Sequence, residues 1–247
     1  ALSPSSHISS PDRTGTGTKI RVADIVALGI FHVACVKIVQ AGAASASSCV
    51  TGNNGTMRKN QKNSFRVDPE SGLIEPAFLC QSPNEDARPE GCEPELIVIH
   101  GISLPPGSFG GPEIEQLFTN RLDWDAHPYF QEIRGMQVSS HLLIRRDGTV
   151  MQFVPFHRRA WHAGDSRFRG RTRCNDFSLG IELEGTDEDR YTDAQYRQLA
   201  AVVRAICAAY PAMSIRNIAG HCDISPGRKS DPGPAFDWLR LYDGLAQ

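Results

Sequence analysis

The most strand-like run in the chain is Glu95-Leu-Ile-Val-Ile-His100, in which four consecutive aliphatic residues end at a histidine. A continuous aliphatic run of this length is typical of a β-strand that is buried on both faces. Such a strand needs cover on each side, which predicts a sheet flanked by helices. His100 would stand at the end of this buried strand.

A second strand is predicted over Phe177-Ser-Leu-Gly-Ile-Glu-Leu-Glu184, where apolar and other residues alternate. The alternation places Glu182 and Glu184 on one face and the apolar side chains on the other. A glutamate in a central strand is costly unless something needs it. We therefore treat these glutamates as candidates for function.

Local signals around these strands complete the fold class. A hairpin is predicted over residues 140–154, turned at Asp147-Gly148. Thr192-Asp-Ala-Gln195 is a capping box that opens a helix ended by Pro211. The helix has an apolar stripe of Tyr196, Leu199, Val203, Ile206 and Tyr210. Together these elements predict an α/β domain over residues 61–247, with a central mixed β-sheet flanked by helices.

Composition describes a soluble globular protein of ordinary charge. The chain has 247 residues, 40% hydrophobic and 22% charged, with a formal net charge of −2. This balance favours neither nucleic acid nor an acidic membrane surface as a partner. The seven cysteines are odd in number and include no Cys-x-x-Cys pair, which indicates reduced thiols in a cytoplasmic protein.

Residues 1–60 differ from the remainder because they are rich in Ser, Thr, Gly and Asn. Their one apolar patch, Ile25–Val39, contains His32 and Lys37 and is too short and too polar to span a bilayer. We expect this extension to be disordered or to derive from an expression vector. The alternative is a degenerate secretory signal, because basic residues precede the patch and small residues follow it.

The C-terminal third concentrates polar residues in one turn-rich stretch, 217–238. His221 follows a short apolar run, and Asp231 stands in a loop whose prolines restrict the backbone. Lys229 lies on the same loop. With His100, this pair would supply the three protein ligands of a catalytic zinc site. Spacing alone leaves open that His221 and Asp231 are ordinary turn residues.

Two neighbouring features have ordinary interpretations as well as functional ones. Cys222 is disfavoured as a ligand or nucleophile, because its side chain would point away from that of His221 in a continuing strand. A basic segment follows Trp161-His162 and would be either a solvated loop or a carboxylate clamp. Its arginines are Arg167, Arg169, Arg171 and Arg173.

Several separate blocks carry a resemblance to a known family. They are Val98-Ile-His100, Phe109-Gly-Gly-Pro112, Arg145-Arg-Asp-Gly148, Ala160-Trp-His-Ala-Gly164, Arg173-Cys-Asn-Asp-Phe-Ser178, Gly180-Ile-Glu-Leu-Glu-Gly185, Tyr191-Thr-Asp-Ala-Gln-Tyr196, Gly220-His-Cys-Asp-Ile224 and Asp231-Pro-Gly-Pro-Ala-Phe-Asp-Trp238. The chain from about residue 65 to 241 resembles the cytoplasmic N-acetylmuramoyl-L-alanine amidases of the AmpD type. This resemblance implies a fold shared with phage amidases and peptidoglycan recognition proteins.

The resemblance also implies roles for individual residues. The zinc ligands carry over onto His100, His221 and Asp231, and the catalytic pair onto Glu182 and Lys229. Three further residues are candidates for substrate binding. They are Arg173, for the carboxylates of the peptide, and His162 and Trp161, beside the pocket. The remaining histidines considered, His127, His141 and His157, are expected to be structural.

The implied reaction is hydrolysis of the amide between N-acetylmuramic acid and L-alanine, chiefly on 1,6-anhydro-N-acetylmuramyl peptides during peptidoglycan recycling. Zn²⁺ suits this reaction because it polarises a carbonyl and activates water. The implied partner is the muropeptide, with no nucleic acid or membrane, and the protein is expected to be a monomer. A non-catalytic peptidoglycan-binding module would be expected to lack one of the five site residues. A zinc peptidase with a His-Glu-x-x-His helix is disfavoured because that motif is absent.

Overall fold

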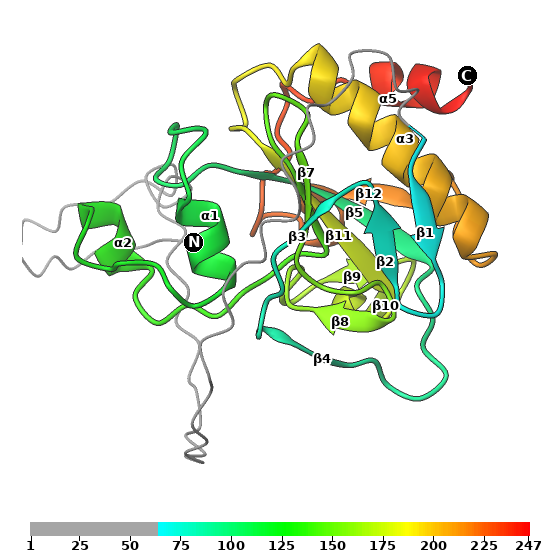
Figure 1. Ribbon diagram of the computed structural model, residues 1–247, viewed down its shortest axis with the longest axis horizontal. Helices are drawn as coiled ribbons and strands as arrows, with labels where there is room; N and C mark the ends of the chain where they lie inside the picture. The colour runs from blue at the N-terminus through cyan, green and yellow to red at the C-terminus, as the bar shows by residue number, and fades with distance from the viewer. Residues whose placement is uncertain (1–63) are drawn as a thin grey trace, which may run out of the picture. The chain divides into compact units, whose positions relative to one another are not determined.

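The computed structural model describes residues 64–247, so the expectations for residues 1–60 lie outside it. Its centre is a six-stranded mixed sheet with the order β12-β5-β11-β6-β7-β3 (Figure 1). The first four strands in this order are parallel, β6 and β7 are antiparallel, and β3 is parallel to β7. Their bounds are β3 Phe78–Leu79, β5 Leu96–Ile102, β6 Leu142–Ile144, β7 Val150–Gln152, β11 Ser178–Glu184 and β12 Ile218–Gly220. The predicted central mixed sheet is confirmed.

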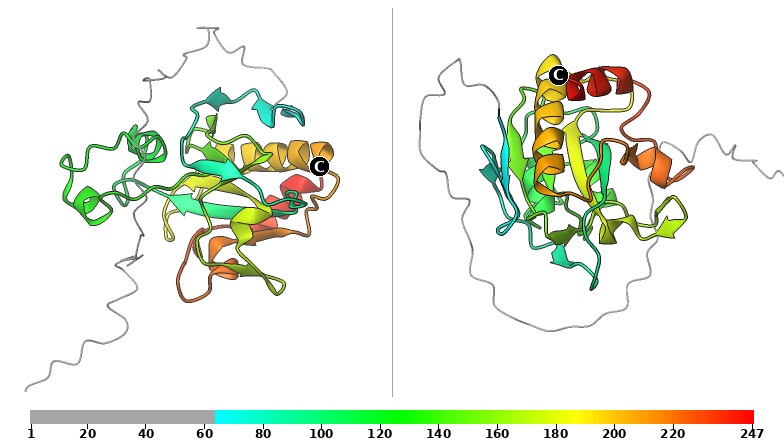
Figure 2. Two further views of the ribbon diagram at one scale, coloured as in Figure 1. Left: turned by 90° about the horizontal axis from the view of Figure 1, so that it is seen from below. Right: turned by 90° about the vertical axis from the view of Figure 1, so that its right-hand side faces the viewer.

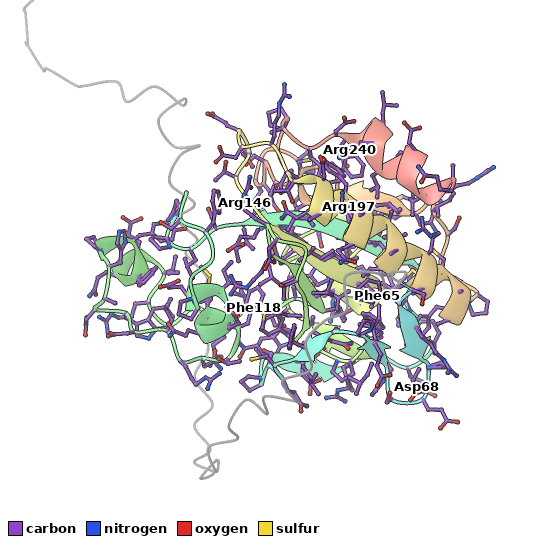
Figure 3. All side chains as sticks on the ribbon, turned by 45° about the horizontal axis from the view of Figure 1, so that its top comes forward. Phe65, Asp68, Phe118, Arg146, Arg197 and Arg240 are labelled. Atoms are coloured by element: carbon purple, nitrogen blue, oxygen red, sulfur yellow. The ribbon has the colours of Figure 1, made fainter. Side chains whose placement is uncertain are left out.

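One face of the sheet carries the main hydrophobic core. Side chains alternate along β5, so that Ile97 and Ile99 belong to this core while Leu96 and Val98 belong to a cluster on the other face. The core is covered by α3 (Asp193–Ala209) with α5 (Trp238–Leu245) beside it (Figure 2). The charged side chains of these helices, such as Arg197 and Arg240, stand on the exposed side (Figure 3).

The predicted start of α3 is confirmed in detail. The Thr192 hydroxyl accepts from the backbone N–H of Gln195, and the Gln195 side chain accepts from the backbone N–H of Thr192. This reciprocal pair satisfies donors that the first helical turn leaves without partners. The amide of Gln195 also donates to the carbonyls of Ile144 and Glu184, which ties the helix start to β6 and β11.

The opposite face of the sheet is covered differently. Among residues 64–247 no long helix lies there. Its cover consists of α4 (His221–Ile224), the 3₁₀ helix η2 (Cys174–Asp176) and loops. A separate cluster is formed around α1 (Glu113–Phe118) and α2 (Pro128–Glu132), which pack with Leu143 and Phe153. Short cover of this kind leaves room for polar side chains at the strand ends.

Smaller strand pairs complete the described chain. They are β1 (Arg66–Asp68) with β2 (Leu73–Glu75), β4 (Glu85–Ala87) with β8 (Arg158–Ala160), and β9 (Arg167–Phe168) with β10 (Arg171–Thr172). The predicted hairpin at Asp147-Gly148 is confirmed as β6 and β7, and Gly148 has φ +90°. In the described part of the chain, no helix combines the length and apolar character that crossing a membrane would require.

Candidate active site and metal centre

Parallel strand pairing brings the candidate residues to one edge of the sheet. Gly220 at the end of β12 lies opposite Ile99 of β5, so His221 follows directly beside His100. On the other side of β5, Glu182 of β11 is the register partner of His100. The backbone N–H of Cys222 donates to the carbonyl of Asp231 at 2.9 Å, which brings the second loop to the same place. The carboxyl edge of parallel strands is the usual position of binding sites in α/β folds.

Three ligand atoms form a nearly equilateral triangle at this edge. His100 Nδ1 lies 3.0 Å from His221 Nδ1, and each of these nitrogens lies 3.1 Å from Asp231 Oδ2. Both histidines are buried, and the three residues form the one candidate metal group found in residues 64–247. A tetrahedral ion with bonds of 2.0–2.1 Å would separate its ligand atoms by about 3.3 Å. The triangle therefore fits a small divalent metal ion after only slight opening.

The far ring nitrogen of His221 shows which nitrogen is free. His221 Nε2 lies 3.1 Å from the carbonyl oxygen of Ala163, which can only accept a hydrogen bond. The guanidinium of Arg228 also lies 3.3 Å from Nε2, but the shorter contact to the carbonyl places a proton on Nε2, so that the lone pair on Nδ1 points into the triangle. A backbone carbonyl in this position is a common way of orienting a metal-binding histidine.

Protonation in the triangle also suits a metal ion. Burial, with a smaller contribution from the charge of His221, lowers the pKa of His100 to about 4. Burial alone would raise the pKa of the Asp231 carboxyl, but its contacts with His100 and His221 hold it well below its usual range. A neutral imidazole and an ionised carboxylate at neutral pH are the forms that bind metal.

Glu182 lies beside the triangle with an unusual environment. Its side chain is buried, and its Oε2 has no hydrogen-bond partner among the described residues. Burial, reinforced by the charge of Asp231, raises the pKa of Glu182 well above its usual value, and the positive charge of Lys229 opposes this shift. A carboxyl with a raised pKa and a free oxygen is suited to exchange protons with a water or a substrate.

The loop after α4 holds Lys229 near these groups. Its backbone N–H donates to the carbonyl of Ser225 at 3.1 Å. Burial is the larger influence on the pKa values of Glu182 and His100, and the positive charge of Lys229 acts to lower both. Its ammonium group therefore interacts electrostatically with the site. The neighbouring Arg228 donates to the carbonyls of Ala163 and Asp165, and so joins this loop to the segment that follows Trp161-His162.

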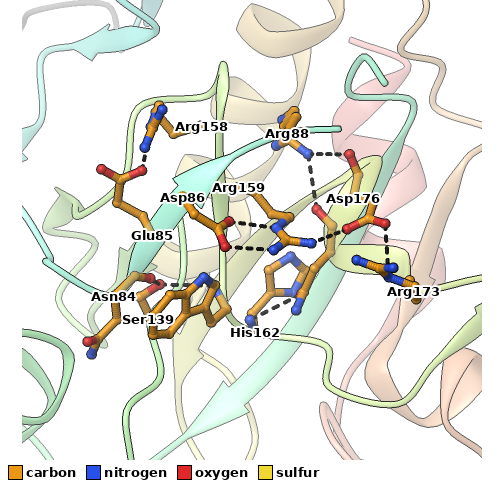
Figure 4. A network of polar contacts seen from close by, with 12 residues as sticks. Asn84, Glu85, Asp86, Arg88, Ser139, Arg158, Arg159, His162, Arg173 and Asp176 are labelled. Carbon is orange, nitrogen blue, oxygen red and sulfur yellow. Dashed lines mark hydrogen bonds and ion pairs between the residues drawn. The ribbon is translucent and has the colours of Figure 1, made fainter. Parts of the chain in front are cut away.

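The basic segment forms a small β-hairpin, β9 and β10, and its arginines have different environments. Arg171 pairs with Glu95 and stacks on Phe177, whereas Arg169 stacks on Phe168. Arg173 has a side chain that is 70% exposed, and its Nε lies 3.2 Å from Asp176 Oδ2. Asp176 in turn binds Arg159 (Figure 4). Arg173 is thus held at one point and open to a ligand at the rest of its guanidinium group.

The other two proposed substrate contacts lie next to each other in the chain. Trp161 is partly buried, and its backbone N–H donates to the hydroxyl of Ser139 at 3.1 Å. His162 is partly exposed, and its Nδ1 lies 2.9 Å from His100 Nε2. His162 therefore touches a member of the triangle, a contact that the sequence did not reveal.

Two sequence interpretations need revision. The strand that carries Gly220 does not continue through Cys222, because α4 begins at His221 and the Asp223 carboxylate caps it by accepting from the N–H of Gly220 at 2.7 Å. The alternation argument about Cys222 was therefore wrong, although Cys222 is not part of the metal group.

The second glutamate, Glu184, accepts from the N–H groups of Gly110 and Arg146 and pairs with Arg145. Its role is to anchor the loop before α1.

A parallel-strand edge with two histidines and an aspartate that could hold a metal ion, beside a buried glutamate, is an arrangement typical of metal-using hydrolases. A family model described as N-acetylmuramoyl-L-alanine amidase matches residues 90–234. The chain therefore belongs to the N-acetylmuramoyl-L-alanine amidase family, as a member of the AmpD type.

Individual relatives agree with this assignment. The chain is 60% identical over 173 residues to the protein of Salmonella typhimurium LT2 named 1,6-anhydro-N-acetylmuramyl-L-alanine amidase AmpD, covering 70% of this chain and 92% of that protein. For the protein of the same name from Escherichia coli K12 the identity is 60% over 172 residues, covering 70% and 93%. A crystal structure of a selenomethionine derivative of AmpD aligns with a TM-score of 0.70 and 56% identity, covering 72% of this chain and 98% of that one.

Proposed function

We propose that this amidase hydrolyses the bond between N-acetylmuramic acid and L-alanine in 1,6-anhydro-N-acetylmuramyl peptides, with Zn²⁺ as its metal. The observation that carries the proposal is the triangle of His100, His221 and Asp231 with Glu182 as its neighbour in register. Two imidazole nitrogens and one carboxylate oxygen form a catalytic zinc set that leaves a position for water. The names of the relatives support the substrate.

The chemistry needs an activated water and a stabilised oxyanion. A zinc ion bound here would supply a Lewis acid that lowers the pKa of water to about 7. Glu182 would accept the proton of the attacking water on its free Oε2 and then deliver it to the nitrogen of the departing alanine. Its raised pKa helps both steps, because it brings proton affinity closer to neutral pH.

Two other residues act on charge rather than on protons. Lys229 stabilises the negative charge that develops on the carbonyl oxygen, because its positive charge acts on this site, where it opposes the raised pKa of Glu182. Arg173 binds a carboxylate of the stem peptide through the exposed part of its guanidinium group, and Trp161 and His162 form the adjoining wall. Glu182 and Lys229 therefore lower the barrier, whereas Arg173 mainly strengthens substrate binding.

The proposed setting is peptidoglycan recycling in the cytoplasm, with the protein acting as a monomer. The five cysteines of the described chain are free thiols, which suits a reducing compartment. The domain proposed for this activity is residues 61–247, and the extension of residues 1–60 would be dispensable for the chemistry.

The test is product analysis by mass spectrometry with purified protein. The substrate would be a 1,6-anhydro-N-acetylmuramyl tripeptide, compared with intact sacculi and with a plain Ala-Glu peptide. We expect release of the peptide from the anhydro sugar, loss of release after chelation, and recovery with Zn²⁺. Cleavage of the plain peptide at a similar rate would show a peptidase instead, and binding without release would show a non-catalytic module.

A further inference from the structure

A chain of hydrogen bonds leads away from the candidate metal centre into the sheet. His100 Nε2 lies 2.9 Å from His162 Nδ1, and His162 Nε2 lies 3.2 Å from Ser178 Oγ. The hydroxyl of Ser178 then donates to the backbone carbonyl of Cys174 at 2.6 Å. These hydrogen bonds thus connect β5, the loop after β8 and the first residue of β11.

The last acceptor fixes the direction of every proton in this chain. A backbone carbonyl can only accept, so the single hydroxyl proton of Ser178 is used on Cys174 and its oxygen must accept from His162 Nε2–H. The neutral ring of His162 then has its lone pair on Nδ1, which must accept from His100 Nε2–H. The neutral ring of His100 is left with its lone pair on Nδ1, the atom that faces His221 and Asp231.

The surroundings of His162 keep its ring in this place. The side-chain oxygen of Asn175 accepts from the backbone N–H groups of His162 and Ala163, at 3.2 and 2.8 Å. The rings of His162 and His100 meet edge to face, with an interplanar angle of 86°. Gly180 makes the room, because a Cβ at that position would lie 2.6 Å from Cγ of His162. The residue of β11 that fits beside the ring is therefore a glycine.

We propose that His162 and Ser178 are positioning residues that hold His100 in the tautomer and orientation needed to bind the metal through Nδ1. This proposal deepens the proposed function and rests on the metal being held by His100, His221 and Asp231. The partner on the far nitrogen of a metal-binding histidine sets which nitrogen carries the proton and makes the ligand more basic. Here that partner is a second histidine, whose own tautomer is set by Ser178.

Removing such a partner typically lowers metal affinity by ~10–100-fold. Without the Ser178 hydroxyl, His162 has no fixed acceptor at Nε2, so it can place its proton on Nδ1 and point a donor at His100. The proton of His100 then moves to Nδ1, where it competes with the metal. We therefore expect Ser178→Ala to weaken zinc binding although residue 178 does not touch the metal triangle.

A matched serine in the loop before β6 supplies the control. Ser140 is also fully buried, and its Oγ lies 2.8 Å from the Cβ position of Gly180. Unlike Ser178, its hydroxyl has no hydrogen-bond partner among the described residues. Ser178→Ala and Ser140→Ala therefore remove the same atom from equally buried places, and only the first breaks the proton chain.

A second pair of variants tests His162 itself. In His162→Asn the side-chain oxygen can take the place of Nδ1 as the acceptor for His100 Nε2–H, whereas His162→Phe fills the space of the ring but accepts nothing. The measurement is the zinc dissociation constant of the full chain, from competition with a chromophoric chelator. Thermal unfolding of the metal-free variants shows whether each one is folded.

The expected result is a zinc dissociation constant raised ~10-fold or more by Ser178→Ala and by His162→Phe, with changes below about 3-fold for Ser140→Ala and recovery of most affinity in His162→Asn. Equal affinity in folded Ser178→Ala, His162→Phe and Ser140→Ala would overturn the proposal. So would an equal loss in His162→Asn and His162→Phe. Failure of the proposed function gives a different result, because the unaltered chain would then bind no zinc or lose none on His221→Ala.

Discussion

Glu182 and His100 are register partners on the neighbouring parallel strands β11 and β5, so their side chains share one face of the sheet. This pairing sets the proposed proton carrier beside a candidate metal ligand without any contribution from a flexible loop. The next alternate residue of β11, Glu184, lies on the same face but opposite Ile102, where it anchors the loop before α1. The two glutamates therefore have different roles because they lie at different positions along β11: Glu182 lies beside the candidate metal ligand, and Glu184 anchors the loop.

The first prediction concerns the proton-transfer role of Glu182. In Glu182→Gln the oxygen that accepts the proton of water is neutral, so kcat should fall by ~10²–10⁴-fold while KM changes little. Zinc content should stay at the level of the unaltered protein, because Glu182 is not in the metal triangle. Steady-state kinetics and metal analysis of the same sample check both points. Loss of zinc in this variant would make Glu182 a ligand.

The second prediction is that Glu182→Gln, although it lowers kcat, makes the metal-free protein more stable. The pKa of Glu182 in the folded, metal-free protein is raised above its usual value, so stability is lost as pH rises from about 4.5 through the folded pKa. Glutamine does not ionise. Metal-free Glu182→Gln should therefore be more stable than the unaltered protein at pH 7.5, by about 1 kcal/mol or more. Urea unfolding at pH 7.5 and pH 4.5 checks this, and an advantage of the same size at both values would contradict it.

A third prediction concerns the metal ligands. Metal analysis should give about one zinc per chain, and His221→Ala should abolish stoichiometric binding because it leaves only two ligands. The control is Cys222→Ser at the next position, whose side chain is outside the triangle. This variant should keep zinc and activity. Retention of zinc in His221→Ala, or its loss in Cys222→Ser, would show that the ligand set is different.

The pH dependence of metal binding gives a fourth prediction. Both histidines must be neutral to bind, so zinc affinity should fall as protons compete for their ring nitrogens. The lowered pKa of His100, about 4, means that this ring stays neutral well below pH 6.5 in the folded protein. Zinc occupancy and activity should decline together on acidification. Titration from pH 8 to pH 4 with both readouts checks this, and activity that outlasts the zinc would contradict it.

The fifth prediction separates substrate binding from catalysis. Arg173→Ala should raise KM by about 10-fold with a smaller change in kcat, because a charge-assisted hydrogen bond to a substrate carboxylate is typically worth ~1.5–3 kcal/mol. Arg169→Ala is the matched control from the same hairpin, since Arg169 stacks on Phe168 and donates to the carbonyl of Arg216. Equal effects of the two substitutions would indicate general attraction between the hairpin and an anionic substrate.

Several features of this protein follow from the sequence alone, because they depend on neighbouring residues. The aliphatic run before His100 predicts a buried strand, and the structure extends this strand to Ile102. The capping box at Thr192 and the turn at Asp147-Gly148 were predicted from local hydrogen bonding and turn chemistry, and both are confirmed. Alternation also placed Glu182 on a face of its strand apart from the apolar residues.

Only the tertiary structure decided how distant segments meet. Spacing left open whether His221 and Asp231 were turn residues. Their nitrogen and oxygen converge on His100 because β12 pairs with β5 in one register and the following loop folds back. The contact of His162 with His100, and its link to Ser178, depend in the same way on the packing of β5, β11 and the loop after β8. Sheet register and side-chain packing join residues far apart in the chain, and neither is encoded in a local pattern.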